Sequence, residues 1–99
     1  SLSYEDYAKQ VNTKFRLSEF DLEIDFFEIS KKKTTSEQEM FSLYFRTPKD
    51  VFLEQRIYKM THRILGEGEI FLVPIALDAN GYCYEAGFNR LINQLIKDD

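Results

Sequence analysis

The sequence predicts a mainly β domain of the α+β class. We expect a small antiparallel β-barrel or sandwich of about six strands, with an N-terminal helix and a short C-terminal helix. The 99 residues include nine Phe and six Tyr, and aromatic residues favour strands over helices. Segments that alternate apolar and polar side chains recur at roughly ten-residue spacing, with turn residues between them. Residues 70–77 and 82–89 are two such runs, and the Asp-Ala-Asn-Gly sequence between them is typical of a β-hairpin.

The composition limits the size and chemistry of the domain. With 43% apolar residues, we expect one domain over residues 1–99 whose core needs neither a metal nor a disulfide. The single cysteine, Cys83, excludes an intramolecular disulfide, and no Cys or His cluster has the spacing of a zinc site. We therefore predict no cofactor and no metal, and a reducing, cytoplasmic location.

Charge and hydropathy exclude two classes of partner. A net charge of −4 and a pI near 5.0 oppose nucleic-acid binding, which needs a clustered basic surface. The lysines at 31–33 are expected in a solvated loop, because short charge runs usually mark exposed turns. No apolar run approaches the roughly 18–20 residues that span a bilayer, and we expect no signal peptide before the domain. We expect neither nucleic acid nor membrane as a partner.

The chain begins with signals for a helix. Ser3 is placed to cap it, and Asp6 occupies the third helical position. Leu2 and Tyr7 have the spacing of a hydrophobic staple. The helix should end near residues 12–13, because the short polar side chains of Asn and Thr compete for backbone hydrogen bonds.

Two strands should follow this helix, over residues 14–20 and 22–29. The apolar phase of the second changes between Phe26 and Phe27, which predicts a one-residue bulge or a bend there. With that bulge, the buried residues should be Leu22, Ile24, Phe27 and Ile29. Residues 30–38 are predicted to form a polar loop.

The next two strands show clear alternation. Over residues 39–46, Phe41, Leu43 and Phe45 point one way, and the following Thr-Pro pair ends the strand. Over residues 56–64, the side chains that share a face are Tyr58, Met60 and His62. A turn at residues 66–68 then leads into the apolar run.

The predicted hairpin connects its strands across residues 78–81. With Asn80 and Gly81 as a two-residue loop of positive φ, Leu77 lies opposite Tyr84. A four-residue loop would shift the pairing but keep the same residues on the same face. Its buried face should comprise Val73, Ile75, Tyr84, Ala86 and Phe88. Ile70 and Leu72 lie on the other side of the same strand. Because that strand is apolar on both faces, something must cover the second one.

A short helix is predicted over residues 90–96, with Asn89 as its cap. Its apolar stripe comprises Leu91, Ile92, Leu95 and Ile96. A helix this short needs packing partners in water. The stripe should therefore pack on the second face of the apolar strand, on the N-terminal helix, or on a neighbouring copy of the chain.

No set of residues forms a catalytic constellation, and the candidate binding residues are His62, Glu85, Tyr58 and Asn89. His62 has the chemistry of a general base, but the simpler interpretation is a half-buried histidine bonded to backbone or to a tyrosine. A pair of His62 with Cys83 is disfavoured because the two residues are expected on different faces. Glu85 either lines a pocket or has a structural role, in which it pairs with Arg63, Arg46 or Lys59 or accepts backbone hydrogen bonds.

Four segments carry a resemblance to a known family. They are Phe-Ser-Leu-Tyr-Phe-Arg-Thr-Pro at 41–48, Tyr58 with His62, Leu65-Gly66 leading to Phe-Leu-Val-Pro at 71–74, and Tyr-Glu-Ala-Gly-Phe-Asn at 84–89. Together the segments resemble a small bacterial domain family of unknown function, over residues 3–89. Such domains are often encoded near proteins that resemble phage tail-collar or tail-fibre components. The resemblance implies a structural or assembly role beside such a partner.

These observations favour a non-enzymatic interaction or assembly module that binds a protein partner or a second copy of itself. The alternative is a small-molecule-binding barrel with an aromatic interior, whose ligand is unknown. An enzyme that uses His62 and Glu85 is the third hypothesis. A core filled by aromatic side chains would oppose the second, and a contiguous apolar surface would favour the first.

Overall fold

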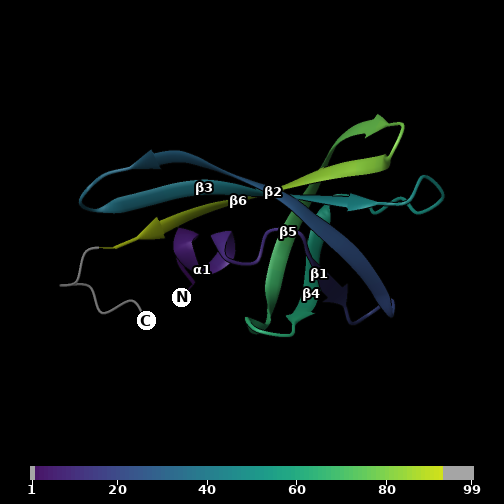
Figure 1. Cartoon of the computed structure of the whole chain (residues 1–99), viewed down its shortest axis with the longest axis horizontal. Coiled ribbons are helices and arrows are strands. Elements are labelled where there is room, and N and C mark those ends of the chain that lie inside the picture. Colours follow the sequence, from purple (N-terminus) through teal and green to yellow (C-terminus); the bar gives the residue numbers. More distant parts are fainter. Residues whose placement is uncertain (1, 93–99) are drawn as a thin grey trace.

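The computed structural model describes residues 2–92, and in that part of the chain one short helix precedes six strands (Figure 1). The elements are α1 (Tyr4–Ala8), β1 (Thr13–Leu17), β2 (Leu22–Thr34), β3 (Gln38–Thr47), β4 (Arg56–His62), β5 (Gly66–Asp78) and β6 (Gly81–Leu91). All neighbouring strands are antiparallel and close into a barrel in the order β1-β2-β3-β6-β5-β4. The prediction of a mainly β domain with about six antiparallel strands and an N-terminal helix is confirmed.

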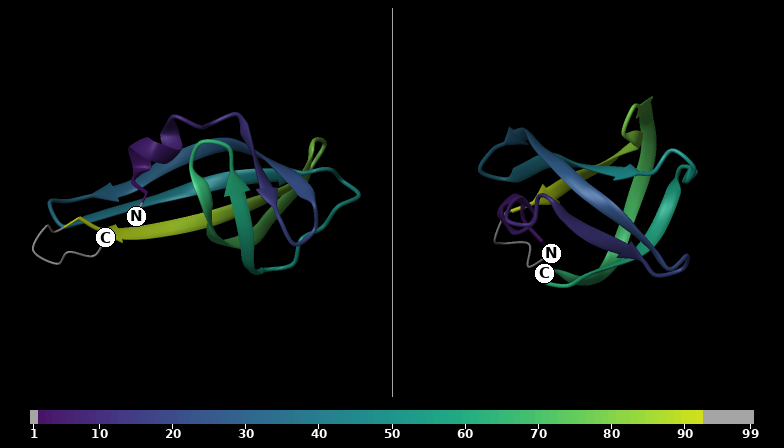
Figure 2. Two further views of the ribbon diagram at one scale, coloured as in Figure 1. Left: turned by 90° about the horizontal axis from the view of Figure 1, so that it is seen from below. Right: turned by 45° about the vertical axis from the view of Figure 1, so that its right-hand side comes forward.

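The molecule is elongated because β2, β3 and β6 continue beyond the residues that form the closed barrel. The molecule measures 46 × 24 × 23 Å. Residues 28–34 of β2, 38–44 of β3 and 86–91 of β6 run past the barrel as a three-stranded extension, which we call the wing (Figures 1 and 2). Helix α1 lies against the inner face of the wing.

Aromatic rings fill the centre of the barrel. Phe15, Phe26 and Phe45 pack with ring centroids 5.1–5.5 Å apart, mostly edge to face. Other side chains with almost no exposure complete the interior, among them Leu17, Ile24, Phe41, Leu43, Tyr58, Ile70, Leu72 and Tyr84. The alternation predicted for β3 and β4 is confirmed, since Phe41, Leu43, Phe45, Tyr58 and Met60 are all buried.

The predicted helix cap is confirmed. Ser3 Oγ accepts from the Asp6 amide, and the Asp6 carboxylate accepts from the Ser3 amide, which forms a capping box. Tyr7 is buried and packs on Phe41 and Phe88, with ring centroids 5.9 and 5.3 Å away. Through Tyr7, the helix covers the aromatic side chains on the inner face of the wing.

The predicted bulge in β2 is confirmed, since the register with β3 shifts between Phe26 and Glu28. The prediction that Phe27 faces the interior was wrong. Phe26 is buried, whereas Phe27 is the bulged residue and lies under the Arg46 guanidinium on the outer face, 4.0 Å from ring centroid to Cζ. Leu22 and Ile29, which were predicted to be buried, are half-buried and pack against the core.

The lysines at 31–33 were predicted in a loop, but β2 continues through them to Thr34. They pair with β3, and a second register shift falls between Lys31 and Lys33. The strand persists because β3 offers a partner along its whole length. Sequence reasoning about charge alone did not detect that partner.

The predicted antiparallel β5–β6 hairpin forms, but Asn80 and Gly81 are not its two-residue loop, and Leu77 lies opposite Tyr82, as the alternative four-residue loop would place it. Asp78 pairs with Gly81, so residues 79–80 form the turn, and the Asp78 carboxylate accepts from the Asn80 amide. Gly81, the first residue after the turn, has a positive φ of 129°, and Asn80 does not have positive φ. A register shift between Pro74 and Ala76 places Pro74 opposite Tyr84.

This shift also changes which face of β5 is buried. Tyr84 and Ala86 are buried as predicted, and Phe88 packs on the core. Val73, however, is only half-buried and Ile75 is 50% exposed, because Ile70 and Leu72 supply the inner face of β5. The outward face is therefore the one that carries Phe71.

The predicted C-terminal helix is also wrong where it can be tested. Strand β6 extends through Leu91, and the Ile92 amide donates to the Glu37 carbonyl of the neighbouring turn. Strand pairing with β3 thus extends past Asn89, where the helix was expected to begin. The rest of that helix, at residues 93–96, lies outside the described residues.

Candidate functional site

His62 is the last residue of β4, and its side chain enters the interior at the end of the barrel near β1. It is 6% exposed and packs on Phe15, with ring centroids 4.6 Å apart. The alternation of Tyr58, Met60 and His62 on one face of β4 places it there, as the sequence predicted.

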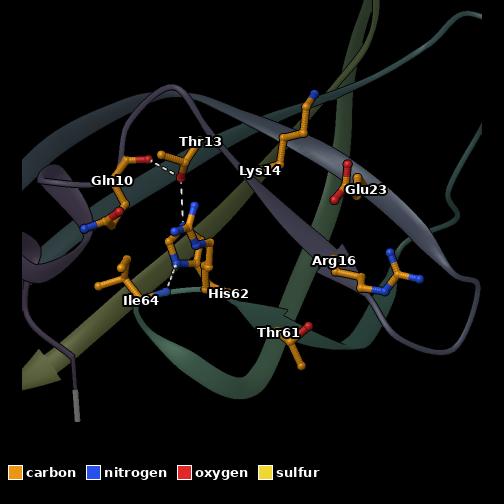
Figure 3. Close-up of a pocket in the computed structure, with 9 residues that line it drawn as sticks. Gln10, Thr13, Lys14, Arg16, Glu23, Thr61, His62 and Ile64 are labelled. Carbon is orange, nitrogen blue, oxygen red and sulfur yellow. Dashed lines mark hydrogen bonds between the residues drawn. The ribbon is translucent and has the colours of Figure 1, made fainter.

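Both ring nitrogens of His62 are engaged (Figure 3). Nδ1 accepts from the backbone amides of Ile64 and Leu65, at 3.0 and 3.2 Å. Nε2 lies 2.8 Å from Thr13 Oγ1, and this hydroxyl donates to the Gln10 carbonyl at 2.6 Å. Since the hydroxyl proton is used on Gln10, Nε2 carries the ring proton and donates to Thr13.

This arrangement requires a neutral imidazole. Nδ1 accepts two amide protons and has no room for a proton of its own. Burial lowers the pKa of His62 below its usual value of 6.5, because the charged form loses hydration. The imidazole therefore has no free nitrogen for proton transfer in this conformation, and it ties β4 and its following turn to β1.

A hollow of about 590 Å³ opens beside His62. It is lined by Gln10, Thr13, Lys14, Arg16, Glu23, Thr61, His62, Arg63 and Ile64. Figure 3 shows that Lys14 and Arg16 extend away from the imidazole. Lys14 pairs with Asp25 and Arg16 with Asp21, so carboxylates outside the hollow already neutralise both cations.

Glu85 lies on the outer face of β6, opposite Tyr44 of β3 and Val73 of β5. Its carboxylate accepts from Ser42 Oγ at 2.6 Å and from the Tyr44 hydroxyl at 3.4 Å, with Lys32 Nζ 4.0 Å away. The predicted pairing with Arg63, Arg46 or Lys59 was wrong, because β2 and β3 supply its neighbours. His62 faces the interior, so the two residues of the enzyme hypothesis lie on opposite faces of the sheet.

Tyr58 and Asn89 both make local bonds. The Tyr58 hydroxyl donates to the Glu54 carbonyl at 2.6 Å, and the Arg56 guanidinium lies over its ring at 4.1 Å. Asn89 lies inside β6 rather than at a helix start, and its side-chain oxygen accepts from Gln38 Nε2 at 2.8 Å. The four candidate residues, His62, Glu85, Tyr58 and Asn89, therefore lie apart from one another and do not form one site.

A second hollow, of about 560 Å³, lies at the other end of β4. Its lining is mostly apolar and includes Phe20, Leu22, Val51, Phe52, Leu53 and Tyr58. The segment between β3 and β4 forms one wall and is held by the Tyr84 hydroxyl, which accepts from the Leu53 amide at 2.9 Å. Sequence reasoning singled out Tyr58 but had no signal for this wall.

The outer face of β4 and β5 carries several of the large apolar side chains that are exposed to solvent. Ile57 and Phe71 are directly paired across the two strands and are 56% and 48% exposed. Val73 follows on the same face, and Ile75 lies next along β5. We call Ile57, Phe71, Val73 and Ile75 the outer apolar face. Lys59, Glu69 and Glu85 border it.

The sequence contained the signal for this face, since it showed β5 to be apolar on both sides. In the structure, the described part of the chain covers only the Ile70 and Leu72 side. Residues 2–92 hold no group of three or more His, Cys, Asp or Glu side chains arranged for a metal ion. Nor does any helix among them have the length and apolar character to cross a membrane.

The fold and surfaces define a small closed antiparallel barrel with one capping helix and an apolar outer wall. By sequence, the chain belongs to the family described as a domain of unknown function, DUF6916, whose model matches residues 2–88. This confirms the resemblance to a small family of unknown function. No curated protein matches the chain. No solved structure matches it either.

Proposed function

We propose that this chain is a non-enzymatic interaction module that docks a larger protein through the outer apolar face. The observation that carries the proposal is the exposed cross-strand pair of Ile57 and Phe71, continued by Val73 and Ile75 and rimmed by charged residues. Contiguous apolar surface with a polar rim is characteristic of protein interaction sites. In such interfaces a few well-packed anchor residues supply most of the binding energy.

The family resemblance gives the partner class. Domains of this kind are expected beside phage-tail-like structural proteins in bacteria, so the proposed partner is such a structural protein, met in the cytoplasm during assembly. The single thiol fits a reducing compartment, since the chain needs no disulfide.

The experiment is recovery of the tagged full chain from its native host, with quantitative comparison of the proteins that co-purify. The test variants are Phe71→Asp and Ile57→Asp, which place a charge in the centre of the face. The matched control is Leu77→Asp, since Leu77 is equally exposed, at 58%, on the same strand but opposite Tyr82.

We expect one structural protein to be depleted at least about tenfold by the two test variants, equivalent to roughly 1.4 kcal/mol, and kept by the control. Equal thermal unfolding midpoints would show that the variants are folded. A partner retained equally by all variants, or no specific partner, would contradict the proposal.

One observation favours a second candidate function, binding of a small apolar molecule. The hollow beside Tyr58 has the size and aromatic lining of ligand sites. The barrel centre is filled by Phe15, Phe26 and Phe45, so a ligand would have to bind at this end. Saturable binding of an apolar fluorescent probe that Phe52→Asp abolishes would support this function, and non-saturable binding would oppose it.

The enzyme hypothesis has less support. The His62 nitrogens are occupied by backbone amides and Thr13, and Glu85 lies on the other face of the sheet. A general base must reach its substrate with a free nitrogen. These contacts favour a structural role for both residues.

A further inference from the structure

The wing has two edges, and they differ in how they are protected. On one side, β1 pairs with β2 only over residues 22–26, so residues 28–34 of β2 form an edge. On the other, β5 pairs with β6 only over residues 81–85, which leaves residues 86–91 of β6 as the second edge. Unpaired strand edges offer rows of amide and carbonyl groups to any strand that approaches.

The β2 edge carries the devices that natural sheets use against strand addition. It has two register shifts, and exposed lysines occupy positions 31–33. Helix α1 also lies on this side of the wing, with the Tyr4 ring 4.6 Å from Lys31 Nζ. Bulges, edge lysines and a covering helix all block pairing with another chain.

The β6 edge has none of these devices in the described part of the chain. Its register with β3 is regular from Gln38 opposite Leu91 to Thr47 opposite Tyr82. The sequence over 86–91 is Ala-Gly-Phe-Asn-Arg-Leu, without proline or lysine. Gly87, Asn89 and Leu91 are exposed.

The free peptide groups of this edge can be identified. The Ile92 amide donates to the Glu37 carbonyl, so it points toward β3. Bonded and non-bonded pairs alternate in an antiparallel ladder. The peptide groups of Gly87, Asn89 and Leu91 therefore point away from β3, toward the side that β5 has left.

We propose that two copies of this chain pair through β6, antiparallel about a twofold axis at Asn89. In this register Asn89 faces its own counterpart, and Gly87 faces Leu91 of the second copy. All three outward peptide groups of each strand are then used, giving six backbone hydrogen bonds. The half-exposed Leu91 lies over the side-chain-free Gly87. Arg90, which pairs with Glu39 of its own copy, comes opposite Phe88.

Charge and shape select a second copy in this orientation. Pairing of β2 with β2 would oppose two lysine clusters, and pairing of β6 with β2 would meet lysines, bulges and α1. Antiparallel β6 pairing sets no like charges opposite each other. It also places the two barrels at opposite ends of the joint sheet, because each barrel begins at residue 85 and extends away from the axis.

The proposal concerns a different surface from the outer apolar face, so it stands or fails separately. The first test compares Asn89→Pro with Asn89→Ala in the full chain by sedimentation equilibrium. Both variants lose the bond from Gln38. Only proline removes the outward amide, and the β3–β6 ladder stays intact because that amide does not face β3.

We expect the wild-type chain and Asn89→Ala to approach twice the 11.8 kDa monomer mass with rising concentration. The dissociation constant of Asn89→Pro should rise at least about tenfold, since two central hydrogen bonds are lost. A monomeric wild-type chain at about 100 µM, or equal association of all three proteins, would overturn the proposal.

A second measurement tests the register and does not depend on the proline variant folding. Asn89→Cys places two thiols across the axis, where Cα atoms of a bonded pair are about 5.5 Å apart, within disulfide range. Oxidation should give a covalent dimer of Asn89→Cys and none of Lys33→Cys, the matched position on the β2 edge. Equal cross-linking of both variants, or of neither, would overturn the proposal.

Discussion

Single polar residues in this barrel hold segments that the strand ladders do not reach. Nδ1 of His62 accepts from the amides of Ile64 and Leu65 and so fixes the turn after β4. The Tyr84 hydroxyl lies 3.0 Å from Thr47 Oγ1 and accepts from the Leu53 amide, which fixes the segment after β3. Buried polar groups are costly unless they are bonded. These residues are therefore part of the fold.

The His62 contacts predict a pH-dependent stability. Burial keeps the folded-state pKa of His62 below 6.5, whereas the unfolded chain titrates near 6.5. Below about pH 6.5 the unfolded state binds more protons, so the free energy of unfolding should fall as pH drops toward the folded-state pKa. Urea unfolding at about pH 7.5 and about pH 5.5 measures the fall.

His62→Gln is the control, because it removes the titrating group and should flatten the pH dependence in this window. The carboxylates of Asp6 and Asp78, whose pKa values are lowered by hydrogen bonds from Ser3 and Asn80, lose their contribution only at lower pH. An unchanged slope in the variant would show that another group carries the effect.

At Gly81 the backbone conformation and the surrounding space both require glycine. Its φ is 129°, and a Cβ there would overlap the Thr47 carbonyl oxygen. We expect Gly81→Ala to lower the free energy of unfolding by about 2–4 kcal/mol in a denaturant titration. Gly68→Ala is the matched control, since its Cβ would meet only Met60 Cε, at 3.9 Å. Equal stability of the two variants would contradict this account.

At the scale of elements, the sequence predicted those features that depend on interactions between residues close together in the chain. The Ser3 cap, the alternation of β3 and the bulge after Phe26 all follow from residues close in sequence. The buried face of β5 did not, because it depends on the register with β6, which shifts between Pro74 and Ala76. That one-residue shift sets which side chains lie on the same face as the buried Tyr84, and no periodicity within β5 encodes it.

The site residues show the same limit. The inward direction of His62 was predictable from the parity of β4, since Tyr58 and Met60 share its face. Its partner Thr13, and Gln10 whose carbonyl accepts from Thr13, were not, because barrel closure brings them from a distant part of the chain. The extension of β2 through the lysines at 31–33 likewise depends on β3 as a partner.

Helix α1 should contribute to stability mainly through the packing of one side chain, Tyr7, and little through its own backbone hydrogen bonds. Five residues do not form a stable isolated helix, but Tyr7 is 5% exposed between Phe41 and Phe88. We expect Tyr7→Ala to lower the free energy of unfolding by about 3–4 kcal/mol in urea titration. Tyr4→Ala is the control and should cost less, because Tyr4 is only half-buried. A larger loss in Tyr4→Ala would be inconsistent with this packing.

At the scale of the whole molecule, the barrel is closed by its shortest seam. Strands β1 and β4 are paired at Arg16 opposite Thr61 and at Leu17 opposite Met60. The Ser18 amide adds one bond to the Lys59 carbonyl, and the His62–Thr13 bond adds a side-chain link. By contrast, β3 and β6 pair without interruption along the whole of β3. Local stability should therefore be lowest at the seam.

Native-state hydrogen exchange can measure this difference. Amides bonded across the β1–β4 seam should exchange through local opening, with a free energy below that of global unfolding, whereas β3–β6 amides should require global unfolding. Because His62 links β4 to Thr13 as a neutral ring, the seam should open more readily as pH falls below about 6.5, and the β3–β6 amides should report only the global change. In His62→Gln the seam should already be weak at neutral pH and insensitive to acidification. Equal opening free energies for both sets of amides would mean that the barrel unfolds as one cooperative unit, with no weak seam.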